Sequence, residues 1–273
     1  MSVLEGKSVA ILGGSGTVGK AVLRHIQEAS IDVDRILIFS RDEIKQLEMM
    51  EEFPEESIPK IEYLLGDIRD VDRLEEILIG IDFVIHAAAI KHVVMAEKNP
   101  EECHKTNVIG TQNVLAACLS KNVSQCLLIS TDKAVNPFGV YGKSKQEAEQ
   151  LYLETVGPTQ FKVIRLGNII GARGSVFEVF ERQKKSGVIK VTHPEATRFC
   201  VSQQDAAQYI IEMFENEAQK QFTPEMETFS VLELAKDIAP ECEIEIVGLR
   251  PGDKLHEQVR ELASTKSLRK IGN

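Results

Sequence analysis

Three features are missing from this 273-residue sequence, and each absence excludes a class of protein. The five cysteines include no Cys-x-x-Cys pair and lie mostly in apolar runs, which argues against a disulfide framework or a metal site. No apolar run approaches the roughly 18 residues that a transmembrane helix requires, and no charged-then-apolar leader opens the chain. We therefore expect reduced thiols, no bound metal and a cytoplasmic protein.

The third deficit is in positive charge. Lysine and arginine number 32 against 42 aspartates and glutamates, which gives a formal net charge of −10. Such a surface repels nucleic acids and anionic membranes, so we expect neither as a partner. Local basic sites for a small phosphorylated molecule remain compatible with this charge.

Apolar, β-rich runs alternate with helical patterns along much of the chain. This alternation predicts an α/β protein with a Rossmann-type, doubly wound parallel sheet. The expected strands cover residues 8–12, 35–39, 61–65, 82–85, 126–129 and 161–165. We expect a Rossmann domain at 1–166 and a smaller α/β lobe at 167–273, with parts of the sheet interleaved. The expected helices and strands of the lobe cover 175–186, 188–191, 203–217, 231–238 and 243–247.

A glycine-rich loop, GGSGTVG, stands between the first expected strand and a helical pattern. Gly14, Gly16 and Gly19 fit G-x-G-x-x-G, whereas Gly13, Gly16 and Gly19 fit the spacing of short-chain dehydrogenases. Both registers predict the same site, in which backbone amides at the start of a helix bind the pyrophosphate of a dinucleotide. The loop residues that we expect to bind this cofactor are Gly13, Ser15, Gly16, Thr17, Val18 and Gly19.

The ends of the next strands predict the remaining cofactor contacts. Ser40 and Arg41 suit a ribose 2′-phosphate, so NADP(H) is favoured, while Asp42 keeps NAD(H) open. Asp67 is expected at the adenine amino group, and the small side chains at 87–89 would let the backbone lie against the nicotinamide ribose. His86 is expected to be packed rather than catalytic. This group of expected cofactor residues comprises Ser40, Arg41, Asp67, Ile68, Ala87, Ala88 and Ala89.

The segment 130–145, STDKAVNPFGVYGKSK, carries the candidate chemistry. Thr131, Asp132 and Lys133 follow an apolar strand, so they are expected at the carboxyl edge of the sheet. Tyr141 and Lys145 are four residues apart and should share one face of a helix, and both are also expected to bind the cofactor. A phenol that acts as a base near neutrality needs its pKa lowered by about 3 units, which a neighbouring lysine and an oxidised nicotinamide would supply together. The alternatives are a solvated lysine and an exposed Asp132–Lys133 ion pair.

These motifs resemble the extended short-chain dehydrogenase/reductases that act on nucleotide sugars. More narrowly, the chain is similar to the inverting UDP-N-acetylglucosamine 4,6-dehydratases of the pseudaminic-acid pathway, in the polysaccharide biosynthesis dehydratase family. The resemblance extends from Lys7 to about Glu261. It is carried by GGSGTVG, SRDEIKQ, HAAAIKHV, STDKAVNP with YGKSK, GNIIGARGSV, TRF and RPGDKLHE.

The resemblance implies a role for each candidate catalytic residue. Tyr141, assisted by Lys145 and Thr131, would take the proton of the sugar 4-hydroxyl while a hydride passes from C4 to the nicotinamide. Lys133 would then be the base at C5 and Asp132 the acid at the C6 oxygen. Tyr141 also indicates the inverting branch, because related retaining enzymes commonly have methionine there. A homo-oligomer is implied as well.

A further group of residues is expected to contact the substrate. The resemblance implies contacts from Lys91, Asn168, Arg250 and Glu257, and Ser175 is expected to join them. Arg173, Arg198 and Arg250 are candidate phosphate clamps, for each of which a surface salt bridge is the alternative.

Some residues depart from the family pattern around the expected sugar pocket. They are Val94, Lys98, Leu166 and Cys200, together with a shortened loop after Leu153 and an early end after RPGDKLHE. They leave open a sister enzyme that inverts C5 of an already dehydrated UDP-sugar or reduces its 4-ketone. A more remote alternative is a non-catalytic protein that senses NADP.

Overall fold

The computed structural model describes residues 2–54 and 60–260. Their centre is a seven-stranded sheet in the order β10-β6-β5-β4-β1-β2-β3, in which every pairing is parallel. This confirms the predicted Rossmann fold class, because the sequence order reverses beside β1, as in doubly wound sheets. The strands are β1 (Ser8–Leu12), β2 (Arg35–Ser40), β3 (Ile61–Leu65), β4 (Phe83–His86), β5 (Gln125–Thr131), β6 (Gln160–Leu166) and β10 (Gln221–Phe222).

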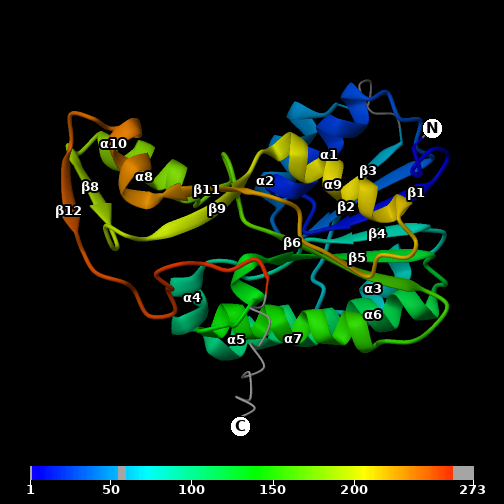
Figure 1. Cartoon of the computed structure of the whole chain (residues 1–273). Coiled ribbons are helices and arrows are strands. Elements are labelled where there is room, and N and C mark those ends of the chain that lie inside the picture. The colour runs from blue at the N-terminus through cyan, green and yellow to red at the C-terminus, as the bar shows by residue number, and fades with distance from the viewer. Residues whose placement is uncertain (1, 55–59, 261–273) are drawn as a thin grey trace, which may run out of the picture.

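Both faces of the sheet are covered by helices (Figure 1). Every residue of β1 is buried: Val9 and Ile11 point into one apolar core, and Ala10 and Leu12 point into another. This two-sided burial explains why the strands are continuous apolar runs rather than alternating ones. The first core is covered by α1 (Thr17–Glu28), α2 (Glu43–Glu52) and α9 (Gln203–Glu215), and the second by α3 (Val71–Ile77), α6 (Gly110–Ser120) and α7 (Val140–Glu154).

Three short helical segments connect β4 to α6. They are α4 (Val93–Lys98), α5 (Pro100–His104) and a π-helical turn (Lys105–Ile109). Ala96 of α4 and Cys103 of α5 pack with Tyr141 of α7 in a small apolar cluster. The start of α7 is therefore held against the segment that follows β4.

The C-terminal lobe lies beside the carboxyl edge of the sheet (Figure 1). It has its own apolar core, to which Phe180, Ile189 and Val231 contribute. In contrast, α9 and β10 return to the main sheet. The lobe comprises β7 (Asn168–Ile169), α8 (Val176–Lys184), β8 (Val188–Val191), β9 (Thr197–Val201), β11 (Glu227–Ser230), α10 (Val231–Ile238) and β12 (Glu243–Ile246). Its strands form a three-stranded sheet, β11-β9-β7, and a pair, β12-β8.

The predicted elements are present, with boundaries shifted by at most two residues. The sequence pattern did not predict β7, β9, β10 or β11. The part of the predicted lobe at 261–273 lies outside the described residues. All five cysteines are free thiols, as expected. In the described parts of the chain, no helix has the length and apolar character needed to cross a bilayer.

Candidate active site

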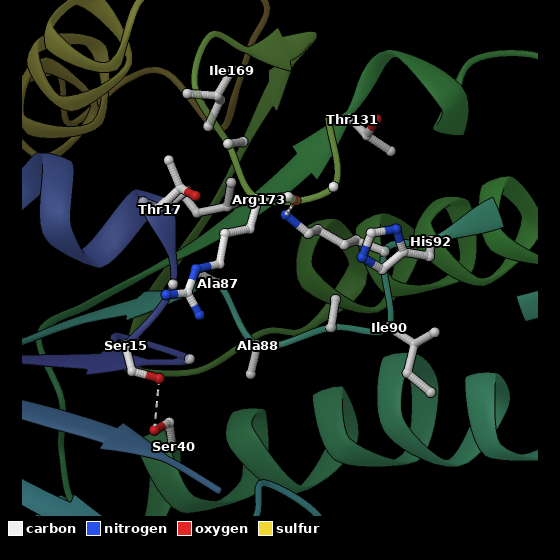
Figure 2. Close-up of a pocket in the computed structure, with 18 of the residues that line it drawn as sticks. Ser15, Thr17, Ser40, Ala87, Ala88, Ile90, His92, Thr131, Ile169 and Arg173 are labelled. Atoms are coloured by element: carbon white, nitrogen blue, oxygen red, sulfur yellow. Dashed lines mark hydrogen bonds between the residues drawn. The ribbon is translucent and has the colours of Figure 1, made fainter. Parts of the chain in front are cut away.

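A cavity of about 1010 Å³ lies along the carboxyl ends of β1, β2, β4 and β5 (Figure 2). Open α/β sheets bind their ligands at this edge, where the strand order reverses. The lining includes every residue predicted for the cofactor except Gly19, and four of the five predicted catalytic residues. The cavity therefore joins the predicted cofactor site to the predicted chemistry.

The glycine loop forms a cradle that fits a dinucleotide. Gly13 has φ of +79°, and a Cβ there would lie 2.6 Å from the backbone nitrogen of Ala88, so only glycine is tolerated. Gly16 precedes α1, whose first amides have no side-chain cap and lie beside the cavity. Such amides bind pyrophosphate oxygens. Gly13, Ser15, Gly16 and Thr17 would thus hold the cofactor.

The region beyond β2 indicates how the adenine ribose would be bound. The Ser40 hydroxyl accepts hydrogen bonds from the Ser15 hydroxyl (2.9 Å) and from Nε2 of Gln46 (3.0 Å). Asp42, the residue that kept NAD open, instead caps α2 by accepting from the backbone N–H of Lys45 (3.0 Å). Arg41 and Lys45 line the cavity. Each cation pairs with a carboxylate, Arg41 with Asp67 (3.4 Å) and Lys45 with Asp42 (2.5 Å), so charges of both signs lie beside Ser40.

Asp67 is held by two arginines. Its carboxylate accepts from Arg69 at 2.7 Å and lies 3.4 Å from the Arg41 guanidinium. It still lines the cavity with Ile68, where an adenine is expected.

The predicted acid and amine form a buried ion pair. Oδ1 of Asp132 accepts from the Thr131 hydroxyl (2.8 Å) and from Nζ of Lys133 (3.0 Å). Asp132 is 0% exposed, so the alternative of an exposed pair is wrong. The reason is local: β5 continues to Thr131, and residues 132–134 then form a 3₁₀ turn under the first turn of α7.

Tyr141 and Lys145 are both buried on α7. Nζ of Lys145 donates to the carbonyl oxygen of Ile129 (2.9 Å), and burial lowers its pKa to about 8 against the opposing charge of Glu149. The alternative of a solvated lysine is therefore wrong. Burial raises the pKa of the Tyr141 phenol to about 12, while the Lys133 ammonium and the Thr131 hydroxyl act in the opposite direction. The protein without a cofactor therefore does not give Tyr141 the lowered pKa that the expected chemistry requires.

Two buried polar residues that the sequence reasoning missed bind the segments beside Tyr141 and Lys145. Glu149 accepts from the Ser130 hydroxyl (2.6 Å) and from Nη2 of Arg165 (2.6 Å). Asn107 donates to the Ser144 hydroxyl (2.9 Å) and accepts from the backbone N–H of Ile90 (2.8 Å). Glu149 follows Tyr141 and Lys145 at four-residue spacing, which was a usable signal. Asn107 lies in a π-helical turn that the pattern does not reveal.

Four of the predicted substrate residues line the cavity, namely Lys91, Asn168, Arg173 and Ser175. Lys91 donates to the carbonyl oxygen of Arg173 (3.0 Å), and the Arg173 side chain pairs with Glu48 (2.6 Å). Asn168 donates to the carbonyl oxygen of Phe199 (3.2 Å), and Ser175 caps α8. Figure 2 shows Arg173 extended beside Ala87 and Thr17.

Three other predicted substrate residues do not line this cavity. Arg198 donates to the carbonyl oxygens of Lys254 and Leu255, each at 3.0 Å, and Arg250 pairs with Asp253 (2.8 Å). Glu257 is buried beside Lys133, with Oε1 3.5 Å from Nζ. In this structure the two arginines thus bind protein groups, and Glu257 faces the amine of Lys133.

His86 is packed, as expected. It is buried and its Nδ1 lies 2.9 Å from the Tyr152 hydroxyl, while burial lowers its pKa to about 3. Within residues 2–54 and 60–260, no three His, Cys, Asp or Glu side chains gather as metal ligands. The expectation of a metal-free protein stays a prediction.

Comparison with known proteins gives matches over most of the chain. Residues 9–271 match the family model described as polysaccharide biosynthesis protein. The chain is 39% identical over 259 residues to a UDP-N-acetylglucosamine 4,6-dehydratase (inverting) of Campylobacter jejuni, covering 92% of this chain and 76% of that protein. It is 36% identical over 279 residues to a UDP-glucose 4-epimerase of Rickettsia conorii, covering 96% and 81%.

Solved structures agree with this relationship. Pen from Bacillus thuringiensis superimposes with a TM-score of 0.89 at 35% identity, over 94% of this chain and 84% of that one. The dTDP-glucose 4,6-dehydratase DesIV from Streptomyces venezuelae, with NAD and TYD bound, has a TM-score of 0.81 over 93% and 88%, and at 18% identity it shows the fold alone. The extent and level of these matches show that the chain belongs to the polysaccharide biosynthesis protein family, as its motifs indicated.

Proposed function

We propose that this protein is a 4,6-dehydratase of UDP-N-acetylglucosamine that inverts C5 and yields a UDP-linked 4-keto-6-deoxy-hexosamine. The observation that carries the proposal is the gathering of Thr131, Lys133 and Tyr141 in one cavity with the glycine cradle, with Asp132 bonded directly behind them. A relative that is 39% identical has this activity in its name. Lys91, Asn168, Arg173 and Ser175 are the proposed substrate contacts.

NADP(H) is the proposed cofactor, and when bound it supplies the hydride acceptor and donor of the internal redox cycle. Ser40, Arg41 and Lys45 support the choice of NADP(H), since they place a hydroxyl and two cations where a 2′-phosphate would lie. Asp42 supports it too, because its carboxylate is engaged as a helix cap. NAD(H) is the alternative, and it is the cofactor in the DesIV structure.

Tyr141 is the proposed base for the 4-hydroxyl proton. Its phenol has a pKa of about 12 in the protein alone, so the base must form with help from neighbouring positive charge. Lys133 and the hydroxyl of Thr131 lower this pKa, and the cationic ring of the oxidised cofactor would add to them. Lys145, bonded to the carbonyl oxygen of Ile129, supports the strand end on which Thr131 stands.

Lys133 and Asp132 are the proposed base and acid for the elimination. A base at C5 requires a neutral amine, and an acid at the C6 oxygen requires a protonated carboxyl. A single proton transfer from Nζ of Lys133 to Oδ1 of Asp132, over 3.0 Å, produces both forms at once. Returning a proton to C5 from the opposite face would invert that centre.

The test is incubation of the purified protein with UDP-N-acetylglucosamine in deuterated water, followed by NMR. We expect the 4-keto-6-deoxy product with one deuterium at C5 and inverted configuration there. Unchanged substrate would reject dehydration, and retained configuration would reject inversion.

A second candidate is a C5-epimerase or 4-ketone reductase that receives an already dehydrated UDP-sugar. Leu166, one of the departures from the family pattern, lines the cavity and favours an altered substrate. Deuterium entering C5 only when the dehydrated sugar is supplied would support this candidate. Turnover of UDP-N-acetylglucosamine alone would exclude it.

We further propose a cytoplasmic homo-oligomer that acts in pseudaminic-acid synthesis. The family resemblance supports both the assembly and the pathway, and the net charge of −10 agrees with a partner that is neither nucleic acid nor an anionic membrane. Sedimentation at several protein concentrations tests the assembly.

A further inference from the structure

The segment 250–258 lies against the Lys133 amine, and hydrogen bonds with two other parts of the chain hold it there. Arg198 of β9 binds two of its carbonyl oxygens. Nζ of Lys254 donates to the carbonyl oxygen of Val135 (2.6 Å), and Asn136 donates to Oε1 of Gln258 (2.7 Å). The position of this segment is thus fixed by several independent bonds.

Close backbone contact also fixes the segment against the start of α7. A Cβ on Gly139 would lie 2.7 Å from Cα of Gly252, so the two backbones touch. Glu97 of α4 accepts from the N–H of Val140 (2.6 Å) at the same place. The segment cannot shift without disturbing the turn that precedes Tyr141.

This packing places Lys133 between two buried carboxylates. Its Nζ lies 3.0 Å from Oδ1 of Asp132 and 3.5 Å from Oε1 of Glu257. The second oxygen of each carboxylate, Oδ2 of Asp132 and Oε2 of Glu257, is buried without a hydrogen-bond partner. Lys254 is the other cation nearby, with Nζ 3.7 Å from Oε2 of Glu257. Buried carboxylates that lack partners depend on adjacent cations, so Lys133 as an ammonium is central to the cluster.

We propose that Glu257 is a positioning residue that holds Lys133 in place and in its ammonium form until the substrate arrives. This role differs from the substrate contact that the family resemblance implied. This role deepens the proposed function. Only the turnover test below rests on that function, because the acetylation test needs no substrate. Burial lowers the pKa of Lys133, but Asp132, Glu257 and Tyr141, the groups that face it, raise the pKa more, and the net shift is upward.

The first test measures the Lys133 amine directly, without substrate. Trace acetylation by acetic anhydride across pH 7 to 11, quantified by mass spectrometry of the Lys133 peptide, reports the neutral fraction of the amine. Removing a charge this close should lower the pKa by about one unit and raise the acetylation rate near pH 8 by about tenfold in Glu257→Gln. Glu257→Asp should recover most of the difference. Glu245→Gln, an exposed residue of the same lobe, should leave it unchanged.

The second test uses turnover. The acid limb of the pH profile for deuterium incorporation at C5 should move down by about one pH unit in Glu257→Gln, with KM unchanged. An unaltered Lys133 acetylation profile would overturn the proposal, and so would a raised KM with an unaltered pH profile. An acetylation shift in a protein that does not turn over UDP-N-acetylglucosamine would retain the role of Glu257 and reject the proposed reaction. If Glu257→Gln does not fold, Glu257→Asp decides. A smaller shift of the Lys133 acetylation profile in the same direction would support the proposal, and no shift would overturn it.

Discussion

Arg173 and Glu48 are 125 residues apart in sequence, yet their side chains pair at 2.6 Å and both line the cavity at the sheet edge. Arg173 comes from the loop after β7, and Glu48 comes from α2 on the main sheet. Lys91 binds the same loop through the carbonyl oxygen of Arg173. The pair therefore crosses the cavity and joins the lobe to the part of the chain that forms the main sheet.

We predict that Arg173→Ala speeds cofactor release by a few fold. The two side chains are 61% and 42% exposed, so the pair contributes under about 1 kcal/mol and a larger effect is not expected. Stopped-flow fluorescence of bound NADPH measures the release rate. Arg35→Ala, which breaks an exposed pair with Glu62 at the sheet edge, is the matched control. Equal release rates in the two variants would contradict the prediction.

Replacing Tyr141 by phenylalanine should lower kcat by about 100-fold to 10,000-fold with little change in KM, because it removes the proposed base and leaves the buried ring in place. Single-turnover absorbance at 340 nm should show no cofactor reduction. Cofactor reduction at the wild-type rate would remove Tyr141 from the mechanism.

Lys145 should make stability depend on pH in a defined direction. Its pKa is about 8 in the folded protein and about 10.5 when unfolded, so between these values the unfolded chain binds more protons and stability rises with pH. The burial penalty is fully present below pH 8 and is lost towards pH 10.5. We therefore expect the free energy of unfolding of wild type, relative to Lys145→Met, to increase by about 3 kcal/mol across this window. Urea unfolding at each pH measures it, and parallel curves for the two proteins would refute it.

Cofactor choice should depend on Arg41. Arg41→Ala removes a cation beside Ser40, so the affinity for NADP should fall about tenfold while that for NAD stays unchanged. Calorimetry with both dinucleotides makes NAD the internal control. An equal loss for the two cofactors would assign Arg41 to the diphosphate or to Asp67 instead.

The cofactor half of the site was predictable because its signals are local. A strand, a glycine loop and a helix follow one another between Ser8 and Glu28, and Ser40 and Asp67 each lie at or just after the end of a strand that a helix follows. The buried Asp132–Lys133 pair was harder, because two adjacent charges after a strand look the same whether a later helix covers them or not.

The lobe could be predicted only in part, since its strands depend on distant partners. β10 has two residues, Gln221 and Phe222, and exists only because Val163 and Ile164 of β6 are available to pair with it. Glu257 reaches Lys133 through the bonds of Arg198, which link residues nearly sixty positions apart. No periodicity within either segment carries that information.

The bonds of Arg198 to the carbonyl oxygens of residues 254 and 255 have a consequence for redesign. β9 also pairs with β7 at Asn168, in the proposed sugar site. A substitution that moves β9 to admit a different hexose would therefore also move Glu257 away from the amine of Lys133. A change in sugar selectivity is therefore expected to change proton transfer as well. Mutant libraries aimed at either property should vary β9 and the segment 250–258 together.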